Sequence, residues 1–535
     1  MNGKGDEIMN KKIDIYDTTL RDGAQFEGIS YSIMDKIRVA QKLDELGVDY
    51  IEGGWPGSNP KDDEFFKIAQ KELKLKNAKL VAFGSTRRAG VRTVSDPVLR
   101  GLLKSGTKYL TIFGKSWDLH VKSVLKTTMH ENLKMIEDSV KYLKSKKRKV
   151  FFDAEHFFDG YKNNPKYAID SLSAAAMGGA EALVLCDTNG GMLTGQLFEI
   201  VEEIGSRFKL PIGIHVHNDA EMAVANSVAA VQAGCTHVQG TINGYGERCG
   251  NANLVSILPA IKYKLGFKCL SDFSFKELTE VARYIAEISN IKLFEAQPYV
   301  GKSAFAHKAG VHVNAVLKDP KSYEHIVPEK VGNKRRMLIS ELSGKSSIVS
   351  KAKEYGFDMD KKSDKARKVL SYVQDLEKKG YQFELAEASL SLLMKRAAGT
   401  FKKHFEIEDF RVIVEKRGDI PVFSEATVKV RIGEKLEHTV SLGDGPVHAL
   451  DQALRKSLIQ FYPSLSGMYL SDFRVRVLDE KSATAAKVRV LIQSQDKKDS
   501  WWTVGVSENI IEASWLALMD SIEYKFMKDE KRKKK

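Results

Sequence analysis

The chain has 535 residues, more than a single domain normally holds, and 43% of them are hydrophobic, so it can bury sizeable cores. The formal net charge of +14 suits either a nucleic acid or anionic small molecules as partners. No zinc finger, RNP motif or recognition-helix pattern accompanies this charge, and no apolar run is long enough to span a bilayer, so we expect neither a nucleic-acid nor a membrane partner.

The N-terminal segment, MNGKGDEIMNKKIDIYD, contains no apolar core of the kind that a signal peptide needs. The cysteines are scattered and include no CxxC pair, which does not suit a disulfide framework and fits a reducing compartment; they are Cys186, Cys235, Cys249 and Cys269. We therefore expect a cytoplasmic protein.

Residues 11–270 alternate short apolar runs with amphipathic segments whose apolar residues have helical spacing. The runs that we interpret as strands are KIDIYDTT, YIEGG, KLVAFGS, YLTIFG, KVFFDAE, ALVLCDT, IGIHVHND and HVQGTING. Eight strands that alternate with helices predict an α/β fold, a (β/α)8 TIM barrel. A doubly wound open sheet is the alternative, which the absence of a GxGxxG motif after the first run weakens.

Polar residues collect where these runs end, and in a barrel that edge carries the chemistry. In chain order they are Asp17, Arg21 and Asp22, then Glu52, Glu155, Asp187, Thr188 and Asn189, and finally His215 and His217. A solvated surface would not place its polar residues so selectively. We therefore expect a catalytic site at this edge of the barrel.

His215 and His217 occupy alternate positions of the seventh run, so both imidazoles face the same side of a strand. In a closed barrel the eighth strand lies between the seventh and the first, so Asp22 or Asp17 can reach the pair. Two neutral imidazoles and a carboxylate predict a divalent metal with open positions, which a 2-oxo acid can fill. Such an ion would polarise the ketone of the acid.

Further candidates for the chemistry lie beside these ligands. Arg21 can stabilise an alkoxide with its permanent charge, or it is a surface arginine in a turn. Glu155 can assist a general base, or it hydrogen-bonds another site residue from outside. His307 lies in AFAHKAGVHVNAV and can take part in acid–base chemistry, because imidazole titrates near neutral pH.

The rest of the chain changes character. Residues 271–404 are mostly helical in pattern and rich in lysine, and we expect small linker subdomains there. Residues 405–526 repeat themselves, because TVSLGDGPVHALDQAL in the first half aligns with TVGVSENIIEASWLAL in the second. Each half reads as three strands and a helix, which predicts an α+β domain made of a duplicated βββα unit. The basic segment 527–535 reads as a disordered tail.

The stretch SLGDGPVHAL in the first repeat is a candidate regulatory site. Asp444 and Gly445 come just before a helix that we expect to begin near Pro446. The free N–H groups of a helix N-terminus suit a carboxylate, glycine lets a ligand approach the backbone, and Asp444 can pair with an amino group. This favours an amino-acid effector, although capping of the helix is the simpler interpretation of Asp444.

Three motifs together, YDTTLRDGAQ, HVHND and TINGYGERCGNANL, resemble the Claisen-condensing barrel family, which contains isopropylmalate, homocitrate and citramalate synthases and has lyase relatives. FFDAEHFFDGYK, LCDTNGG and AFAHKAGVHVNAV look most like the long citramalate synthase branch. The resemblance covers nearly the whole chain, because the C-terminal repeat looks like the leucine-pathway regulatory domain.

The resemblance implies a metal site at Asp22, His215 and His217, with Asn251 as a further or outer ligand. The bound ion would be manganese or magnesium, and cobalt or zinc is the alternative. Of the remaining candidates it implies that Arg21 stabilises the oxyanion, and the residues that would contact the 2-oxo acid are Arg21, Thr188 and Glu52. The residues that would handle protons as the acetyl-CoA methyl group is deprotonated are Glu155 and His307.

The resemblance also implies the substrates acetyl-CoA and pyruvate, thioester hydrolysis after condensation, isoleucine as the feedback effector and a homodimer. With 2-oxoisovalerate or a longer acid the same chemistry would make isopropylmalate or homocitrate. Three further classes of protein stay open: a metal-dependent hydrolase, a hydroxymethylglutaryl-CoA lyase and a basic nucleic-acid-binding protein. The sequence departs from the family at His156, where many relatives have aspartate, and a linker tyrosine of some relatives has no clear counterpart near Tyr323.

Overall fold

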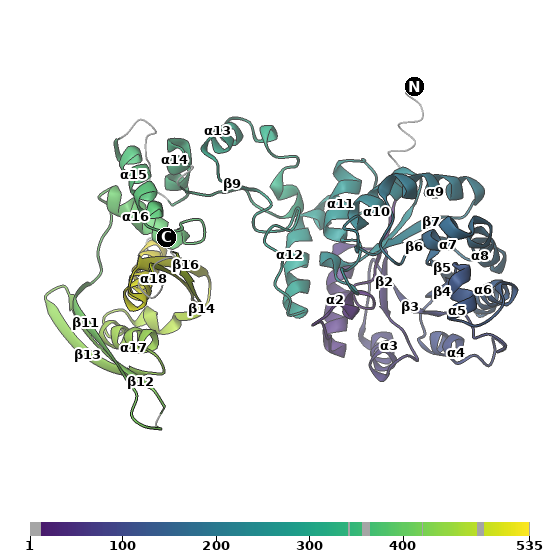
Figure 1. Ribbon diagram of the computed structural model, residues 1–535, viewed down its shortest axis with the longest axis horizontal. Coiled ribbons are helices and arrows are strands. Elements are labelled where there is room, and N and C mark those ends of the chain that lie inside the picture. Colours follow the sequence, from purple (N-terminus) through teal and green to yellow (C-terminus); the bar gives the residue numbers. More distant parts are fainter. Residues whose placement is uncertain (1–11, 341–342, 356–363, 420, 479–485, 534–535) are drawn as a thin grey trace. The chain divides into compact units, whose positions relative to one another are not determined.

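The structure is a computed structural model that describes residues 12–340, 343–355, 364–419, 421–478 and 486–533 (Figure 1). The chain folds into two compact units. The first consists of residues 1–305 and 325–335, and the second of residues 306–324 and 336–535. No helix within the described ranges is long and apolar enough to cross a membrane.

The first unit is built around a closed barrel of parallel strands that follow one another in chain order, and β8 pairs with β1 to close it. The strands are β1 (Asp14–Asp17), β2 (Tyr50–Gly54), β3 (Lys79–Ser85), β4 (Tyr109–Lys115), β5 (Lys149–Glu155), β6 (Ala182–Asp187), β7 (Ile212–Val216) and β8 (His237–Gly240). Each lies within one of the runs interpreted as strands, except that β4 continues one residue further, to Lys115, so the predicted TIM barrel is confirmed and the open sheet is wrong.

Helices surround the barrel strands (Figure 1). They are α2 (Ile33–Leu46), α3 (Pro60–Glu72), α4 (Pro97–Lys104), α5 (Asp118–Ser123), α6 (Met129–Ser145), α7 (Phe157–Asn163), α8 (Pro165–Gly178), α9 (Thr194–Arg207), α10 (Ala223–Gln232) and α11 (Leu254–Tyr263). Side chains next to the N-terminus determine where two of these helices begin. Ser32 and Asp35 form a reciprocal capping box at α2, and the Asp96 side chain accepts hydrogen bonds from two backbone N–H groups of α4. The starts of these two helices are therefore encoded locally.

Aromatic rings fill the amino end of the barrel. Tyr16 packs against Tyr50 and Phe151 with ring centroids 6.0 and 6.1 Å apart, and His237 lies 5.2 Å from Tyr16. All four belong to strands, so their inward positions follow from alternation along each strand. Because this end is packed, a substrate site belongs at the opposite, carboxyl end of the strands.

The first unit continues past the segment predicted as catalytic. Helix α12 (Asp272–Ile288) packs against α2 and buries Phe275, Leu278 and Val281 in the core of this unit. The predicted division at residue 270 separates α12 from the barrel, whereas the structure keeps them together. The reason is the apolar stripe of α12, which is buried only when the barrel helices cover it.

The second unit begins with short elements and helices. They are β9 (Ala306–His307), α13 (Gly310–Lys318), β10 (Arg336–Met337), α14 (Lys345–Glu354), α15 (Asp364–Lys378) and α16 (Glu387–Ala397). Two three-stranded antiparallel sheets follow, each ending in a helix. The elements are β11 (Glu406–Glu415), β12 (Phe423–Ile432), β13 (Lys435–Gly443), α17 (Pro446–Leu458), β14 (Tyr469–Val477), β15 (Val488–Gln495), β16 (Ser500–Ser507) and α18 (Ile510–Lys533). The predicted duplicated βββα unit is therefore confirmed.

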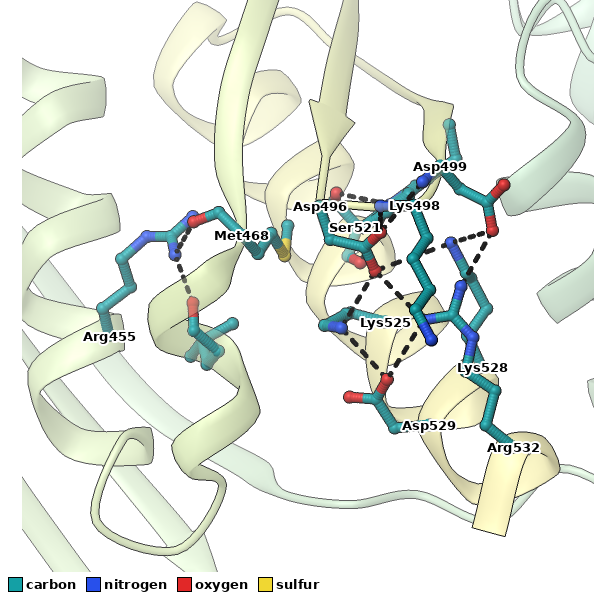
Figure 2. A network of polar contacts seen from close by, with 12 residues as sticks. Arg455, Met468, Asp496, Lys498, Asp499, Ser521, Lys525, Lys528, Asp529 and Arg532 are labelled. Atoms are coloured by element: carbon teal, nitrogen blue, oxygen red, sulfur yellow. Dashed lines mark hydrogen bonds and ion pairs between the residues drawn. The ribbon is translucent and has the colours of Figure 1, made fainter. Parts of the chain in front are cut away.

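The predicted disordered tail is wrong as far as residue 533, because α18 extends that far. Figure 2 shows why: Lys525, Lys528 and Arg532 of this helix gather around acidic residues from the turn between β15 and β16. Lys525 lies 3.0 Å from Asp496, and Lys528 and Arg532 each lie 3.0 Å from Asp499. The run of positive charge looks unpaired only along the sequence, because its acidic partners come from another element.

Candidate active site

Asp22, His215 and His217 meet at the carboxyl end of the barrel, and their ligand atoms all lie within 4.8 Å of one another. The Nε2 atoms of the two histidines are 3.3 Å apart, and Asp22 Oδ2 lies 3.4 Å from His215 Nε2 and 3.9 Å from His217 Nε2. All three side chains are buried. Alternation along β7 aims both imidazoles the same way, and the turn after β1 brings in the carboxylate.

The second carboxylate that the sequence placed within reach, Asp17, does not join this cluster. It accepts hydrogen bonds from the backbone N–H and the hydroxyl group of Thr19, at 2.9 and 3.0 Å. Burial raises the pKa of Asp17 to about 7, although the bonds from Thr19 oppose this. Asp17 therefore shapes the turn that carries Asp22.

The charges in the cluster are strongly coupled. Burial disfavours the charged form of Asp22, but the Arg21 guanidinium and the hydrogen bond to His215 outweigh it and hold the pKa of Asp22 far below its usual range. Burial, together with the neighbouring His215, lowers the pKa of His217 to about 4, so His217 is neutral at pH 7. A permanent carboxylate beside a neutral imidazole is a donor set that suits a divalent cation.

A buried polar atom beside this cluster, Asn251 Oδ1, supports that fit. Asn251 pairs with His217 in an isolated antiparallel bridge, which sets it next to the cluster. Within the described ranges, the Oδ1 atom of Asn251 and the Nδ1 atom of His217 are buried without a hydrogen-bond partner. A buried oxygen without a partner is costly unless something else binds it, and a carbonyl-type oxygen is an acceptable ligand for a divalent ion.

Arg21 lies between the cluster and an aromatic wall. Its Nη1 atom is 3.3 Å from Asp22, its Nε atom donates to Glu52, and its guanidinium carbon lies 3.8 Å from the centroid of the Phe83 ring. Burial disfavours its charge, but Glu52 and Asp22 raise the pKa of Arg21 above its ordinary value. Arg21 is thus a fixed, largely buried cation beside the candidate metal ligands, not a surface arginine.

The structure changes the role predicted for Glu52. Its carboxylate is buried and accepts a hydrogen bond of 2.6 Å from the Tyr16 hydroxyl group as well as the bond from Arg21. With both oxygens engaged by the protein, Glu52 is not free to bind a substrate. It orients the Arg21 guanidinium instead.

The aromatic wall beside Arg21 consists of Trp55, Phe83 and Phe113, from the ends of β2, β3 and β4. Their ring centroids are 5.5 to 5.7 Å apart. Phe83 and Phe113 stack on each other and stand edge-on to Trp55, so the wall offers an apolar surface next to Arg21.

Thr188 follows β6, and Glu155 is the last residue of β5, on the same barrel edge. The Thr188 hydroxyl group accepts a hydrogen bond of 2.9 Å from the backbone N–H of His156, which leaves its own proton free to bind an anionic oxygen. His156 adopts a left-handed backbone with φ of 55°, and its ring lies 4.2 Å from that of His120. Glu155 is ion-paired with Lys115. The departure from the family at His156 therefore falls on the residue that holds Thr188.

The remaining predicted residues belong to the second unit. His307 is in β9, and its Nε2 atom lies 3.2 Å from Glu324. Gly445 is the N-cap residue of α17, as expected from the sequence. The Asp444 side chain is fully exposed and makes no capping hydrogen bond, while its backbone N–H donates to His448 Nδ1 at 3.2 Å. The simpler interpretation of Asp444, a side-chain cap, is therefore wrong.

Sequence reasoning missed three buried residues that contact the site. The Tyr16 hydroxyl group donates to Glu52, the Gln239 amide oxygen accepts from His215 Nδ1 at 3.0 Å, and the Gln239 amide nitrogen donates to Asp153. A signal was present, because Asp153 precedes Glu155 by two positions on β5 and Gln239 follows His237 by two positions on β8. Residues at alternate positions of a barrel strand share one face, and here that face points inward. A polar side chain buried there is costly unless it has a hydrogen-bond partner.

Family models and relatives agree with this architecture. The model described as HMGL-like matches residues 12–285, that of the homocitrate synthase post-HMGL domain matches 299–380, and that of the LeuA allosteric (dimerisation) domain matches 384–526.

Among curated relatives, the (R)-citramalate synthase of Aquifex aeolicus is 56% identical over 98% of this chain and 99% of its own length. That of Geobacter sulfurreducens is 54% identical over 97% of this chain and 98% of its own. The 2-isopropylmalate synthase of Methanocaldococcus jannaschii is 30% identical over 97% of this chain and 96% of its own. With these identities over nearly its full length, and with this site at the end of an HMGL-like barrel, the chain belongs to the (R)-citramalate synthase family.

Proposed function

We propose that this enzyme condenses the acetyl group of acetyl-CoA with pyruvate and then hydrolyses the thioester, releasing (R)-citramalate and CoA for isoleucine biosynthesis. The observation that carries the proposal is the buried cluster of Asp22, His215 and His217 with the Arg21 guanidinium beside it. The relatives named (R)-citramalate synthase support the choice of reaction. Such relatives share this barrel, the linker and the C-terminal repeat over nearly the whole chain.

The site residues have separate roles in metal binding and in substrate binding. A divalent ion bound by Asp22, His215 and His217, with Asn251 as a further or outer ligand, would supply a Lewis acid that polarises the ketone of pyruvate. Manganese or magnesium suits this mixed nitrogen and oxygen set, and cobalt or zinc is the alternative. The Thr188 hydroxyl group donates a hydrogen bond to the pyruvate carboxylate, and this bond orients the keto carbon.

Bond formation needs a nucleophile and a place for negative charge. Glu155 and His307 handle the proton that leaves the acetyl-CoA methyl group, and the resulting carbanion forms a bond to the keto carbon of pyruvate. The ketone oxygen gains the negative charge, which Arg21 stabilises while Glu52 holds the guanidinium in place. Water then attacks the thioester, and CoA leaves as the thiol.

The relatives support pyruvate over longer acids, because the chain is 56% and 54% identical to two (R)-citramalate synthases and 30% identical to a 2-isopropylmalate synthase. The methyl group of pyruvate is the smallest substituent that a 2-oxo acid of this kind carries. The rings of Trp55, Phe83 and Phe113 give such a group an apolar surface to pack against. The proposal therefore favours citramalate over isopropylmalate and homocitrate.

The C-terminal repeat fits regulation and assembly. We propose that residues 405–526 build a homodimer and bind isoleucine at Asp444 and Gly445, where the N-terminus of α17 offers free N–H groups to the amino-acid carboxylate. The match to the LeuA allosteric (dimerisation) domain supports both parts. The division into a catalytic part that includes α12, a linker and this domain belongs to the same proposal, as does a cytoplasmic location.

The test is a substrate panel with release of free CoA as the signal. The full-length enzyme, with each of the four metals in turn, receives acetyl-CoA together with pyruvate, 2-oxoisovalerate or 2-oxoglutarate. We expect the highest kcat/KM with pyruvate, (R)-citramalate as the product, and no turnover after chelation. A higher kcat/KM with either longer acid would make the substrate assignment wrong, and cleavage of hydroxymethylglutaryl-CoA without condensation would indicate a lyase.

A further inference from the structure

A row of buried polar side chains runs from the candidate metal site into the barrel. His215 Nδ1 lies 3.0 Å from Gln239 Oε1, and Gln239 Nε2 donates to Asp153 Oδ1 at 3.0 Å. The three residues come from β7, β8 and β5, and all are buried. The row therefore crosses the barrel interior and ends on one candidate ligand.

The chemistry of the row fixes the direction of each hydrogen bond. An ionised carboxylate only accepts, so the amide NH2 group of Gln239 faces Asp153 and its carbonyl oxygen faces His215. The Nδ1 atom of His215 must then carry a hydrogen, so a neutral His215 has its lone pair on Nε2, on the side of Asp22 and His217. That is the tautomer a ligand needs when it binds a metal through Nε2.

The charge state of Asp153 is consistent with this direction at mildly alkaline pH. Burial raises the pKa of Asp153 to about 7, while the nearby charge of His215 favours the ionised form. Above that pH the carboxylate only accepts. A divalent ion at the site would favour the ionised form further, because opposite charges stabilise each other.

The two histidines differ in this respect. Among the described residues, the Nδ1 atom of His217 is buried without a hydrogen-bond partner, whereas that of His215 is anchored. The ring of His215 is thus held in rotation, with its hydrogen kept on Nδ1, before any ion arrives. The row has a specific target and is not a general feature of the strand ends.

We propose that Gln239 is a positioning residue of the metal site, which sets the tautomer and ring orientation of His215 and is itself held by Asp153. The inference rests on the metal-dependent function proposed above. Removing the Gln239 amide should weaken metal binding, because adopting this tautomer and orientation would then cost His215 free energy on binding.

The experiment measures metal affinity directly, without substrate. Mn2+ and Co2+ are titrated into the full-length, metal-free protein at about pH 8, above the pKa of Asp153, and the Co2+ absorption bands report the geometry of the ligands. We expect Gln239→Leu to raise the Kd for Mn2+ about 10–100-fold and to shift the Co2+ bands. Asp153→Asn, which keeps an oxygen to accept from Gln239, should stay within about threefold of wild type.

A matched control separates positioning from damage to the fold. Val238 is the buried neighbour of Gln239 on β8 and points to the other face of the strand. Val238→Ala should lower the Tm and leave the Kd for Mn2+ unchanged. If Gln239→Leu leaves the Kd within about threefold of wild type, or if Val238→Ala weakens binding as much, the inference is overturned.

Two further outcomes keep the test decisive. If Gln239→Leu does not fold, the pair Asp153→Ala and Asp153→Asn replaces it, and equal Kd values for the two would overturn the inference, whereas weaker binding by the alanine variant supports it. If the wild-type protein itself binds no metal, the proposed function fails, and that result is distinguishable from a failure of the row alone.

Discussion

The carboxyl end of the barrel and the turn before α17 were both predicted to be sites, and they differ in what supports them. In the barrel, Asp22, His215 and His217 are buried and within 4.8 Å of one another. In the C-terminal repeat, the Asp444 side chain is fully exposed and lies beside an exposed histidine. A closed barrel brings the ends of distant strands together, whereas a turn gathers only its own neighbours. The difference predicts large effects of substitution in the barrel and small ones in the repeat.

The largest effect should come from His217→Ala. We expect loss of metal binding and at least a ~1,000-fold fall in kcat/KM with pyruvate, because a Lewis acid contributes several kcal/mol to transition-state stabilisation. Metal content by elemental analysis and release of free CoA are the two measurements. Phe294→Ala, at an exposed side chain of the same unit, is the control and should change neither. A metal-free variant with full activity would contradict the proposed metal site in the barrel.

Arg21→Lys should come next. The lysine keeps the charge but loses the planar group that Glu52 orients, so it cannot hold its charge at the same point. We expect kcat to fall about 10²–10³-fold, with the Kd for Mn2+ nearly unchanged. Arg100→Lys, at an exposed arginine of α4, serves as the matched control. If Arg21→Lys retains kcat within a few-fold of wild type, the oxyanion role is wrong.

These two predictions depend on features that the sequence already indicated. Alternation predicted the eight strands, and closure of the barrel predicted that β7 and β1 end near each other. The sequence left Asp17 and Asp22 as equal candidates, because the choice between them depends on the turn after β1, in which Thr19 engages Asp17. The sequence pattern thus predicts which strands end near each other. It does not predict which of two neighbouring carboxylates is engaged by another side chain.

Several residues required the structure. Glu52 looked like a substrate contact, but the hydroxyl of Tyr16 and the guanidinium of Arg21 occupy its oxygens. The helical end of α18 looked disordered, because its acidic partners Asp496 and Asp499 lie in a distant turn. In each case the missing information was a contact across many residues of sequence, which charge and periodicity along the chain do not encode.

A buried ionic cluster in the C-terminal unit gives an effect of intermediate size, on stability alone. The His404 side chain is buried, with Nδ1 2.6 Å from Glu523 and Nε2 3.3 Å from Glu530. Burial opposes its charge, but the two carboxylates raise the pKa of His404 above its ordinary value. A raised folded-state pKa stabilises the fold fully below the unfolded-state pKa, and this contribution is lost as the pH rises through the folded-state pKa.

We therefore expect His404→Leu to lower the free energy of unfolding of the second unit by about 2 kcal/mol at about pH 6, and by less at about pH 9. Urea unfolding of the full chain at both pH values measures this. His448→Leu, at an exposed histidine of α17, should have no effect. A cost for His404→Leu that does not shrink as the pH rises would contradict the charged state of the histidine. Catalytic activity should be retained, which keeps the two regions distinct.

The smallest effect should come from Asp444→Ala, and it tests the weaker side of the comparison most directly. The side chain is exposed, so its removal should leave the Tm and the uninhibited rate unchanged. An exposed ion pair to an amino group is worth little, so we expect the inhibition constant for isoleucine to rise only about 2–5-fold. Glu508→Ala is the matched control, because Glu508 occupies the equivalent position before α18 in the second repeat. If isoleucine does not inhibit the wild-type enzyme, the effector assignment is wrong. If it inhibits Asp444→Ala and Glu508→Ala equally, the effector binds elsewhere in the repeat, and the turn before α17 is only the start of a helix.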